Sequence, residues 1–489
     1  MKMPQVKVLK KSENDVDASP TKAFFVEMLT RDIELKDAVL DLLDNCLDGV
    51  MRTIGGRKAS AKAKRSETPY AGFHAEIEFD KDHFRITDDC GGMDKETLEK
   101  KAFRLGRPKL DPATKSLPTV GLYGIGMKRA IFKMGSSCVV TTRYGDKAYQ
   151  VIITPEWLQD DKQWHLDLQE VEPSKLKKGT TIEIKKLHTS VSREFDRIKN
   201  KDFERDFSSM VGTHYSYIFH KGFSVKINGI TPKPRDFNFR FNTLSKSKEK
   251  IAPYMFQGNV DNVDVELVVG LYRDVPSVAE LEEMDEGTRF RRENAGWTII
   301  CNDRVVVFND TDYLTGWGEA KVPKYHTQFV AITGVVRFSS SDPGLLPLTT
   351  TKRGINQNSA LYAEIKNIMR EGLKHFTDFT NKWKADPQGR KEIYKETTSV
   401  SPTKAMKLVN STDWTTSRRF RGRLFIPKLP VPGAGALNVR TISFKRSVDD
   451  IRTVALYLFE EADTQPIRVG ERCFDDFLTI ANAERTTSR

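Results

Sequence analysis

The amino-acid sequence predicts an α+β fold, because segments with the period of a β-strand and segments with the period of an α-helix both occur in it. Residues 74–79 and 84–87 alternate apolar and polar side chains, which is typical of two strands joined in a hairpin. Between residues 35 and 47, apolar side chains instead recur every three or four positions, as on the buried face of an amphipathic helix. Strands and helices are therefore expected in the first domain.

A second group of strand and helix patterns occurs further along the chain. Residues 296–308 predict a hairpin with Asn302 and Asp303 at its turn, and residues 329–338 predict another strand. A helical pattern then runs from about residue 359 to residue 383. These segments indicate a second domain.

Length and composition agree with a multidomain globular protein. The chain has 489 residues, enough for about three domains. Its content of 38% hydrophobic and 30% charged residues suits a protein with a substantial core. Five cysteines show no Cys-x-x-Cys spacing, so neither a zinc site nor a disulfide framework is indicated. No signal-peptide core and no run of about 18 apolar residues is found, which predicts a cytoplasmic location.

Two polar residues stand one helical turn apart in the first predicted helix. Asp41 and Asn45 are four positions apart, so their side chains lie on the same side of that helix. An asparagine carbonyl oxygen can hold Mg²⁺ against phosphate oxygens, and a carboxylate one turn earlier can orient or deprotonate an attacking water. The solvated face of an aspartate-rich helix explains the pair equally well.

A second polar cluster follows the first predicted hairpin. Asp88 stands at a strand end, where loops often carry functional groups. Gly91 and Gly92 would let the backbone turn tightly and approach a flat ring closely. Taken alone, the cluster is most simply explained as a turn.

A glycine-rich segment precedes another predicted helix. Gly121, Gly124 and Gly126 come before Lys128, where the helix is expected to begin. Glycines at a helix N-terminus expose backbone N–H groups to an anion, and Lys128 could add a positive charge on a phosphate. The spacing fits neither a Walker loop nor the dinucleotide fingerprint, and a flexible linker is the alternative interpretation.

In this order, the three clusters resemble the GHKL ATPases, the superfamily of gyrase B subunits, ninety-kilodalton heat-shock chaperones, histidine kinases and MutL. Within it the chain is most similar to MORC-type proteins and their bacterial relatives. Residues 179–182, Gly-Thr-Thr-Ile, match the Gly-Thr step that these families place near the adenine pocket. The resemblance covers about residues 20–375.

The resemblance implies a domain order. Residues 1–190 would form a Bergerat-type α/β sandwich that binds ATP, with an N-terminal strap and a basic insertion at 52–72. Residues 191–385 would form a transducer-like α/β domain, and residues 386–489 a small basic C-terminal region of unknown fold.

The resemblance also assigns roles to single residues, with ATP and Mg²⁺ as cofactors. Asn45 would coordinate Mg²⁺, and Asp88 would accept a hydrogen bond from the adenine amino group. The other expected nucleotide contacts are Gly92, Met93, Gly121, Gly124, Gly126, Lys128 and Thr180. Between residues 94 and 120 the families place a lid over the nucleotide, in which Arg104, Arg107 and Lys109 either meet phosphates or are solvated.

Asp41 occupies the position of the general base, where hydrolytic relatives usually carry glutamate. Aspartate is one methylene shorter, so its carboxylate would stand about 1 Å further from the water, a displacement that can lower a rate about 100-fold. Slow hydrolysis, or catalysis through a second water, is therefore expected. Cys90 also departs from the pattern, since glycine is common there.

Lys352 matches a lysine that, in relatives with a transducer domain, reaches back to the γ-phosphate. Arg353 is the neighbouring candidate, and a basic surface loop is the alternative interpretation. A cation that contacts only the terminal phosphate can distinguish ATP from ADP.

Positive charge is unevenly distributed. The formal net charge is +12 and the pI is near 9.2, which suits a nucleic-acid partner. One basic cluster lies at 57–65, and the segment 414–448 contains no acidic residue, with Phe420 and Phe425 among its arginines. A solubilising basic surface is the alternative. The tail from residue 449 is expected to contain one helix, at 450–462.

Two functions fit these observations. The first is a slow ATP hydrolase that forms a homodimer on ATP binding and closes as a clamp on nucleic acid. The alternative is a chaperone-like ATPase acting on protein clients, or a nucleotide-locked scaffold with little hydrolysis. A histidine kinase is disfavoured, because no phosphoacceptor histidine precedes the helix that carries Asn45.

Overall fold

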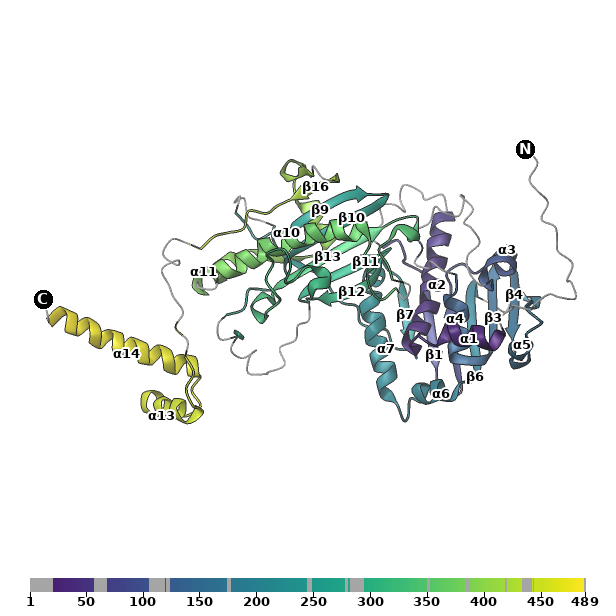
Figure 1. Cartoon of the computed structure of the whole chain (residues 1–489), viewed down its shortest axis with the longest axis horizontal. Coiled ribbons are helices and arrows are strands. Elements are labelled where there is room, and N and C mark those ends of the chain that lie inside the picture. Colours follow the sequence, from purple (N-terminus) through teal and green to yellow (C-terminus); the bar gives the residue numbers. More distant parts are fainter. Residues whose placement is uncertain are drawn as a thin grey trace, which may run out of the picture.

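The computed structural model contains two large sheets, each packed against helices, a small two-stranded sheet, and a pair of helices at the C-terminal end (Figure 1). It describes residues 21–56, 68–104, 119, 124–173, 177–243, 249–277, 280–281, 294–349, 352–383, 387–417, 420–432, 442 and 444–487. The basic cluster at 57–65, Gly121, Arg107, Lys109 and most of the expected N-terminal strap lie outside the described residues.

The first sheet has seven strands in the order β5-β4-β3-β6-β2-β1-β7. They are β1 (His74–Phe79), β2 (His83–Asp88), β3 (Gly135–Tyr144), β4 (Lys147–Ile153), β5 (Leu168–Val171), β6 (Gly179–Leu187) and β7 (Ser224–Ile227). β1 and β2 form the antiparallel hairpin that their alternating side chains predicted, while β1 and β7 are parallel. Since β7 belongs to this sheet, the first sheet continues past residue 190.

Helices cover this sheet and complete its core. In α2 (Leu35–Gly56), Val39, Leu42, Leu43 and Leu47 are all buried, which confirms the predicted amphipathic helix. α2 packs against α4 (Gly126–Met134), which in turn contacts α1 (Lys22–Thr30). The other helices of this part are α3 (Lys95–Thr97) with a π-helical turn at Leu98–Ala102, α5 (Pro155–Gln159), α6 (Thr189–Phe195), α7 (Lys201–His214) and α8 (Ser216–His220). We call this sheet with helices α1–α8 the first body.

The second sheet also has seven strands, in the order β12-β11-β13-β10-β9-β16-β15. They are β9 (Tyr254–Val260), β10 (Val263–Leu271), β11 (Gly296–Cys301), β12 (Arg304–Asp310), β13 (Ile332–Ser339), β15 (Thr415–Ser417) and β16 (Arg421–Phe425). The predicted hairpin is confirmed, with Asn302 and Asp303 at its turn in the left-handed region, at φ 44° and 69°. α10 (Ala360–Lys382), close to the predicted 359–383, packs on this sheet. We call this sheet with α10 the second body.

Residues beyond 385 contribute to the second body as well. β16 pairs with β9, and β15 pairs with β16, so part of the basic run at 414–448 is sheet structure. A small sheet joins β8 (Phe239–Asn242) to β14 (Thr397–Val400), next to α11 (Pro387–Tyr394) and α12 (Pro402–Leu408).

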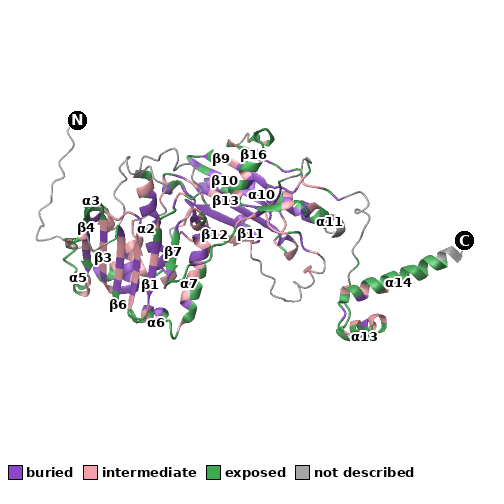
Figure 2. Ribbon diagram, turned by 180° about the vertical axis from the view of Figure 1, so that it is seen from behind, coloured by how far each residue is buried: buried purple, intermediate pink, exposed green. Residues whose placement is uncertain are grey.

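The C-terminal tail contains two helices where one was expected. α13 (Val448–Phe459) and α14 (Pro466–Thr487) contact each other. Figure 2 shows both as mostly exposed, in contrast to the buried strands of the two bodies. α14 was not predicted, although Phe474, Phe477 and Leu478 recur at helical spacing; in the structure these three side chains are exposed.

All five cysteine thiols are free, and they differ in exposure. Cys46, Cys90, Cys138 and Cys301 are buried, and burial raises the pKa of each of these four thiols. Cys473, in α14, is half-buried. Among the helices that the structure describes, none combines the length and apolar composition that crossing a bilayer requires.

The β11–β12 turn joins the two bodies. Asp303 accepts hydrogen bonds from the Tyr70 hydroxyl and from the Lys221 ammonium, both of the first body. The side-chain amide of Asn302 donates to the carbonyl of Thr119 at 3.0 Å. The second sheet is therefore held against the first body by polar contacts at a tight turn.

His214 lies at the same joint and is expected to make it sensitive to acid. Its ring Nδ1–H donates to the Val305 carbonyl of β12 at 2.6 Å. Burial and the nearby Arg304 lower the pKa of His214 to about 4. The unfolded chain therefore binds a proton at a higher pH than the folded protein, so stability that is complete above about pH 6.5 falls by up to about 3 kcal/mol as the pH drops to about 4.

Urea unfolding at pH 7.5 and pH 5.0 checks this prediction. The wild type should lose more stability on acidification than His214→Gln, whose amide can still donate to Val305 but does not titrate. Equal losses in the two proteins would show that His214 does not contribute.

Candidate active site

The first group of predicted site residues meets where β2 and β6 lie side by side. Asp88 ends β2, and its carboxylate accepts hydrogen bonds from the backbone N–H groups of Cys90, at 2.8 Å, and of Thr180 at the start of β6. The Cys46 thiol of α2 also hydrogen-bonds to it. Burial raises the pKa of Asp88 in spite of these bonds. The half-buried carboxylate is thus fixed in place by three hydrogen bonds.

Thr142 of β3 completes this group and was missed from the sequence. Its buried hydroxyl accepts a hydrogen bond from the Met93 backbone N–H at 2.9 Å and lies 3.1 Å from the Thr180 hydroxyl. It also donates to the Gly179 carbonyl at 3.2 Å. A threonine within a strand of alternating pattern carries no signal of this role, since only the pairing of β3 with β6 brings it to Thr180.

Two glycines allow the backbone segments to approach each other. Gly92 has φ +71°, and a Cβ there would lie 2.2 Å from the Arg143 carbonyl oxygen. Gly179 has φ +130°, and its Cβ would lie 1.8 Å from the Asp88 carbonyl oxygen. Only glycine fits at either position, because both the conformation and the space exclude a side chain.

Gly179→Ala is therefore expected to destabilise the first body and to disturb Asp88. The left-handed conformation alone costs an alanine about 1–2 kcal/mol, and the clash with the Asp88 backbone adds to that. Gly145→Ala is the matched control, since Gly145 also has a positive φ (+59°) but a Cβ there meets no atom within 4 Å. Denaturant unfolding should show the larger loss for Gly179→Ala. Similar losses would mean that the close approach to Asp88 is unimportant.

The second group of predicted residues lies on one side of α2. The Asp41 carboxylate is buried, pairs with the Arg129 guanidinium of α4, and accepts a hydrogen bond from the Lys352 ammonium at 3.3 Å. It faces the start of α4, because a Cβ added at Gly126 would lie 3.2 Å from the Asp41 carboxyl carbon. The structure thus brings Asp41, Gly126 and Lys352 together, although Lys352 is 311 residues away from Asp41.

The surrounding charges keep Asp41 ionised. Burial by itself would raise the pKa of Asp41, but the positive charges of Lys352 and Arg129 outweigh it, and the pKa lies below its ordinary value. For Lys352, burial would lower the pKa, but Asp44 and Asp41 outweigh it and raise the pKa. The two groups therefore form a true ion pair, and Asp41 has a low affinity for a proton.

Asn45 lies on α2, one turn after Asp41 and next to Cys46, whose thiol hydrogen-bonds to Asp88. Its side chain is half-buried, and its amide nitrogen is buried with no hydrogen-bond partner among the described residues. An unpaired N–H donor can bind only an acceptor, such as a phosphate oxygen, so Mg²⁺ would be held by the amide oxygen of Asn45 instead. Within the described residues no cluster of three or more His, Cys, Asp or Glu side chains is arranged for a metal. A Mg²⁺ ion on Asn45 would hence take its other ligands from phosphates and water.

Lys128 is turned toward the backbone in this structure. Its ammonium donates to the carbonyls of Ala102 and Arg104, each at 2.9 Å, and to that of Gly124. Burial lowers the pKa of Lys128 to about 8. These three bonds use its three donors and tie residues 102–104 to the turn before α4, so a phosphate contact would require one of them to be exchanged.

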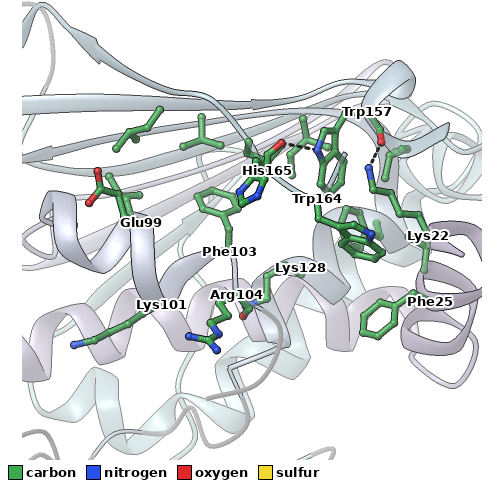
Figure 3. A pocket seen from close by; sticks show the side chains of 18 of the residues that line it. Lys22, Phe25, Glu99, Lys101, Phe103, Arg104, Lys128, Trp157, Trp164 and His165 are labelled. Atoms are coloured by element: carbon green, nitrogen blue, oxygen red, sulfur yellow. Dashed lines mark hydrogen bonds between the residues drawn. The ribbon is translucent and has the colours of Figure 1, made fainter. Parts of the chain in front are cut away.

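A cavity of about 770 Å³ adjoins Lys128 (Figure 3). Its walls include Phe25, Phe103, Trp157 and Trp164. Of the described residues that we expect to contact the nucleotide, only Lys128 lines this cavity. Arg104, from the expected lid, lines it as well. The cavity is thus distinct from the group around Asp88.

The structure thus places a half-buried carboxylate at a strand end, an asparagine on α2 and a glycine turn at the N-terminus of α4 within one α/β sandwich. Comparison with known families agrees, since residues 33–189 match the model described as the histidine kinase-, DNA gyrase B- and HSP90-like ATPase. This segment is accordingly a GHKL-type ATPase domain. The match identifies the superfamily and not one of its branches. No curated protein matches the chain.

Proposed function

We propose that the chain binds Mg²⁺·ATP in the first body and hydrolyses it slowly. The observation that carries this proposal is the contact of Lys352, from the second body, with Asp41 beside the start of α4. The membership of residues 33–189 in the ATPase superfamily supports ATP binding. Lys352 comes from the second body and lies beside Asp41, the proposed general base. This arrangement is expected for a cation that senses the terminal phosphate of ATP.

Four side chains would have separate roles in binding and hydrolysing ATP. Asp88 would accept a hydrogen bond from the adenine amino group, and Asn45 would hold Mg²⁺ through its carbonyl oxygen. Bound Mg²⁺·ATP supplies the phosphoryl group to be transferred and part of the charge neutralisation. Asp41 would orient the attacking water and accept its proton, and Lys352 would stabilise negative charge on the terminal phosphate.

The electrostatics of Asp41 support slow turnover. General-base catalysis is most efficient when the pKa of the base lies near the working pH. Lys352 and Arg129 keep the pKa of Asp41 below its ordinary value, so it would be a weak base while both cations remain in place.

Binding of Mg²⁺·ATP is tested by calorimetry on the wild type and Asp88→Asn. The wild type should bind, and Asp88→Asn should bind about 10–100-fold more weakly, because a hydrogen bond to a charged group is lost. Absence of binding to the wild type would overturn the proposal.

We further propose that the ATP-bound chain forms a homodimer that acts on nucleic acid. The net charge of +12 and the exposed Arg421 and Arg423 of β16 support a polyanionic partner. The Arg423 guanidinium lies 4.5 Å from the Trp414 ring centroid, so charge and an aromatic surface occur together.

DNA binding measured by fluorescence anisotropy at several salt concentrations tests this finer proposal. Arg421→Gln/Arg423→Gln should weaken binding and reduce its salt dependence. Arg197→Gln/Arg205→Gln removes the same charge from the first body and is the matched control. Nucleotide-dependent capture of an unfolded protein without DNA affinity would favour a chaperone-like function instead.

A further inference from the structure

Asp44 is a fully buried carboxylate on α2, between Asp41 and Asn45. One of its oxygens accepts a hydrogen bond from the Tyr215 hydroxyl at 2.5 Å. The other accepts from the Arg304 guanidinium and from the Lys352 ammonium, the latter at 2.9 Å. Arg304 is the first residue of β12. Two cations of the second body, Arg304 and Lys352, therefore pair with the Asp44 carboxylate of the first body.

The Asp44 and Asp41 carboxylates face different parts of the molecule. Asp41 faces the start of α4, where the nucleotide phosphates are expected, whereas Asp44 contacts Tyr215 and Arg304. Lys352 lies between the two, closer to Asp44 (2.9 Å) than to Asp41 (3.3 Å). Lys352 can therefore leave Asp41 and still keep a partner on α2.

The ion pairs of this cluster are shared between α2 and the second body. Asp41 and Asp44 contact three cations, Arg129, Arg304 and Lys352, and all five side chains are buried or nearly so. Lys352 contacts both carboxylates, so it can lose one partner and keep the other. Removing Asp44 would leave Lys352 with one carboxylate acceptor instead of two, and the shorter of its two contacts would be lost, so its ammonium would be held less firmly on α2.

We infer that Asp44 is a positioning residue, which anchors Lys352 and Arg304 on α2 so that Lys352 can exchange Asp41 for the terminal phosphate. This inference rests on the proposed ATPase function. Asp44 itself would contact no reacting atom and would act through Lys352.

Asp44→Asn, which keeps the shape and removes the charge, tests the inference kinetically. We expect kcat to fall on the order of tenfold or more while the affinity for Mg²⁺·ATP changes less than about threefold, because the lost interaction concerns the chemical step. The variant should also melt at a lower temperature, since two buried cations lose a partner.

The double variant Asp44→Asn/Arg304→Gln separates positioning from mere stability. Removing the uncompensated Arg304 charge should restore the melting temperature, but kcat should stay low because Lys352 still lacks its anchor. Recovery of kcat together with stability would overturn the inference.

Acetylation of Lys352, followed by mass spectrometry, provides a readout that needs no turnover. Lys352 should react faster in Asp44→Asn than in the wild type. Lys366, which pairs with Glu319 at 2.8 Å, is the control and should react equally in both. Unchanged reactivity of Lys352 in the folded variant would overturn the inference, whereas a wild type that neither binds nor hydrolyses ATP would overturn the proposed function instead.

Discussion

Replacing Asp41 with asparagine is expected to lower ATP turnover about 100-fold or more, the range typical of losing a general base. Asparagine has nearly the same shape but cannot accept a proton, and it leaves Lys352 paired with Asp44. The measurement is steady-state phosphate release in protein free of contaminating ATPase, together with the affinity for Mg²⁺·ATP. The affinity should change much less than the rate.

Asp37→Asn is the matched control for this experiment, because Asp37 lies one turn earlier on α2 and pairs with Arg353. It should keep most of the turnover. Equal turnover in wild type and Asp41→Asn would remove Asp41 from the mechanism. Binding without turnover in either protein would identify a nucleotide-locked scaffold.

Lys352→Met is expected to show the second large effect, on stability as well as on turnover. Lys352 is buried and pairs with two buried carboxylates, Asp41 and Asp44. Its removal leaves their negative charges less neutralised, which should lower the free energy of unfolding by about 3–5 kcal/mol. Turnover should fall with it, because no cation of the second body would reach the terminal phosphate. Urea unfolding and phosphate release measure the two effects.

Arg353→Met tests which of the two neighbouring cations matters. The Arg353 side chain is 27% exposed and pairs with Asp37 and Glu34, away from Asp41, so its loss should cost only about 1 kcal/mol and leave turnover largely intact. A larger effect at Arg353 than at Lys352 would assign the sensor to Arg353.

The sequence could predict elements whose periodicity is strong and local. The apolar spacing of α2, the β1–β2 hairpin and the turn at Asn302 and Asp303 are of this kind, and the structure confirms them. The spacing of motifs also sufficed to name Asp41 and Lys352, which the structure brings together. Their roles in catalysis stay predictions.

The remaining site features depend on contacts between distant segments. Asp44 stands in the same motif as Asp41, yet its role depends on Tyr215 and Arg304, which lie 171 and 260 residues away. Lys128 lies in the expected segment, but the direction of its side chain is set by carbonyls of residues 102 and 104. Strand pairing such as that of β16 with β9 likewise has no local signal, because register is set by the partner strand.

The uneven burial of the thiols gives the molecule a natural attachment point. Four of the five cysteines are buried, which raises the pKa of their thiols, whereas Cys473 on α14 is only half-buried. A maleimide dye should consequently couple to Cys473 first, without any engineered residue. Energy transfer between donor-labelled and acceptor-labelled chains would then follow the association of two copies in real time, as nucleotide is added and consumed.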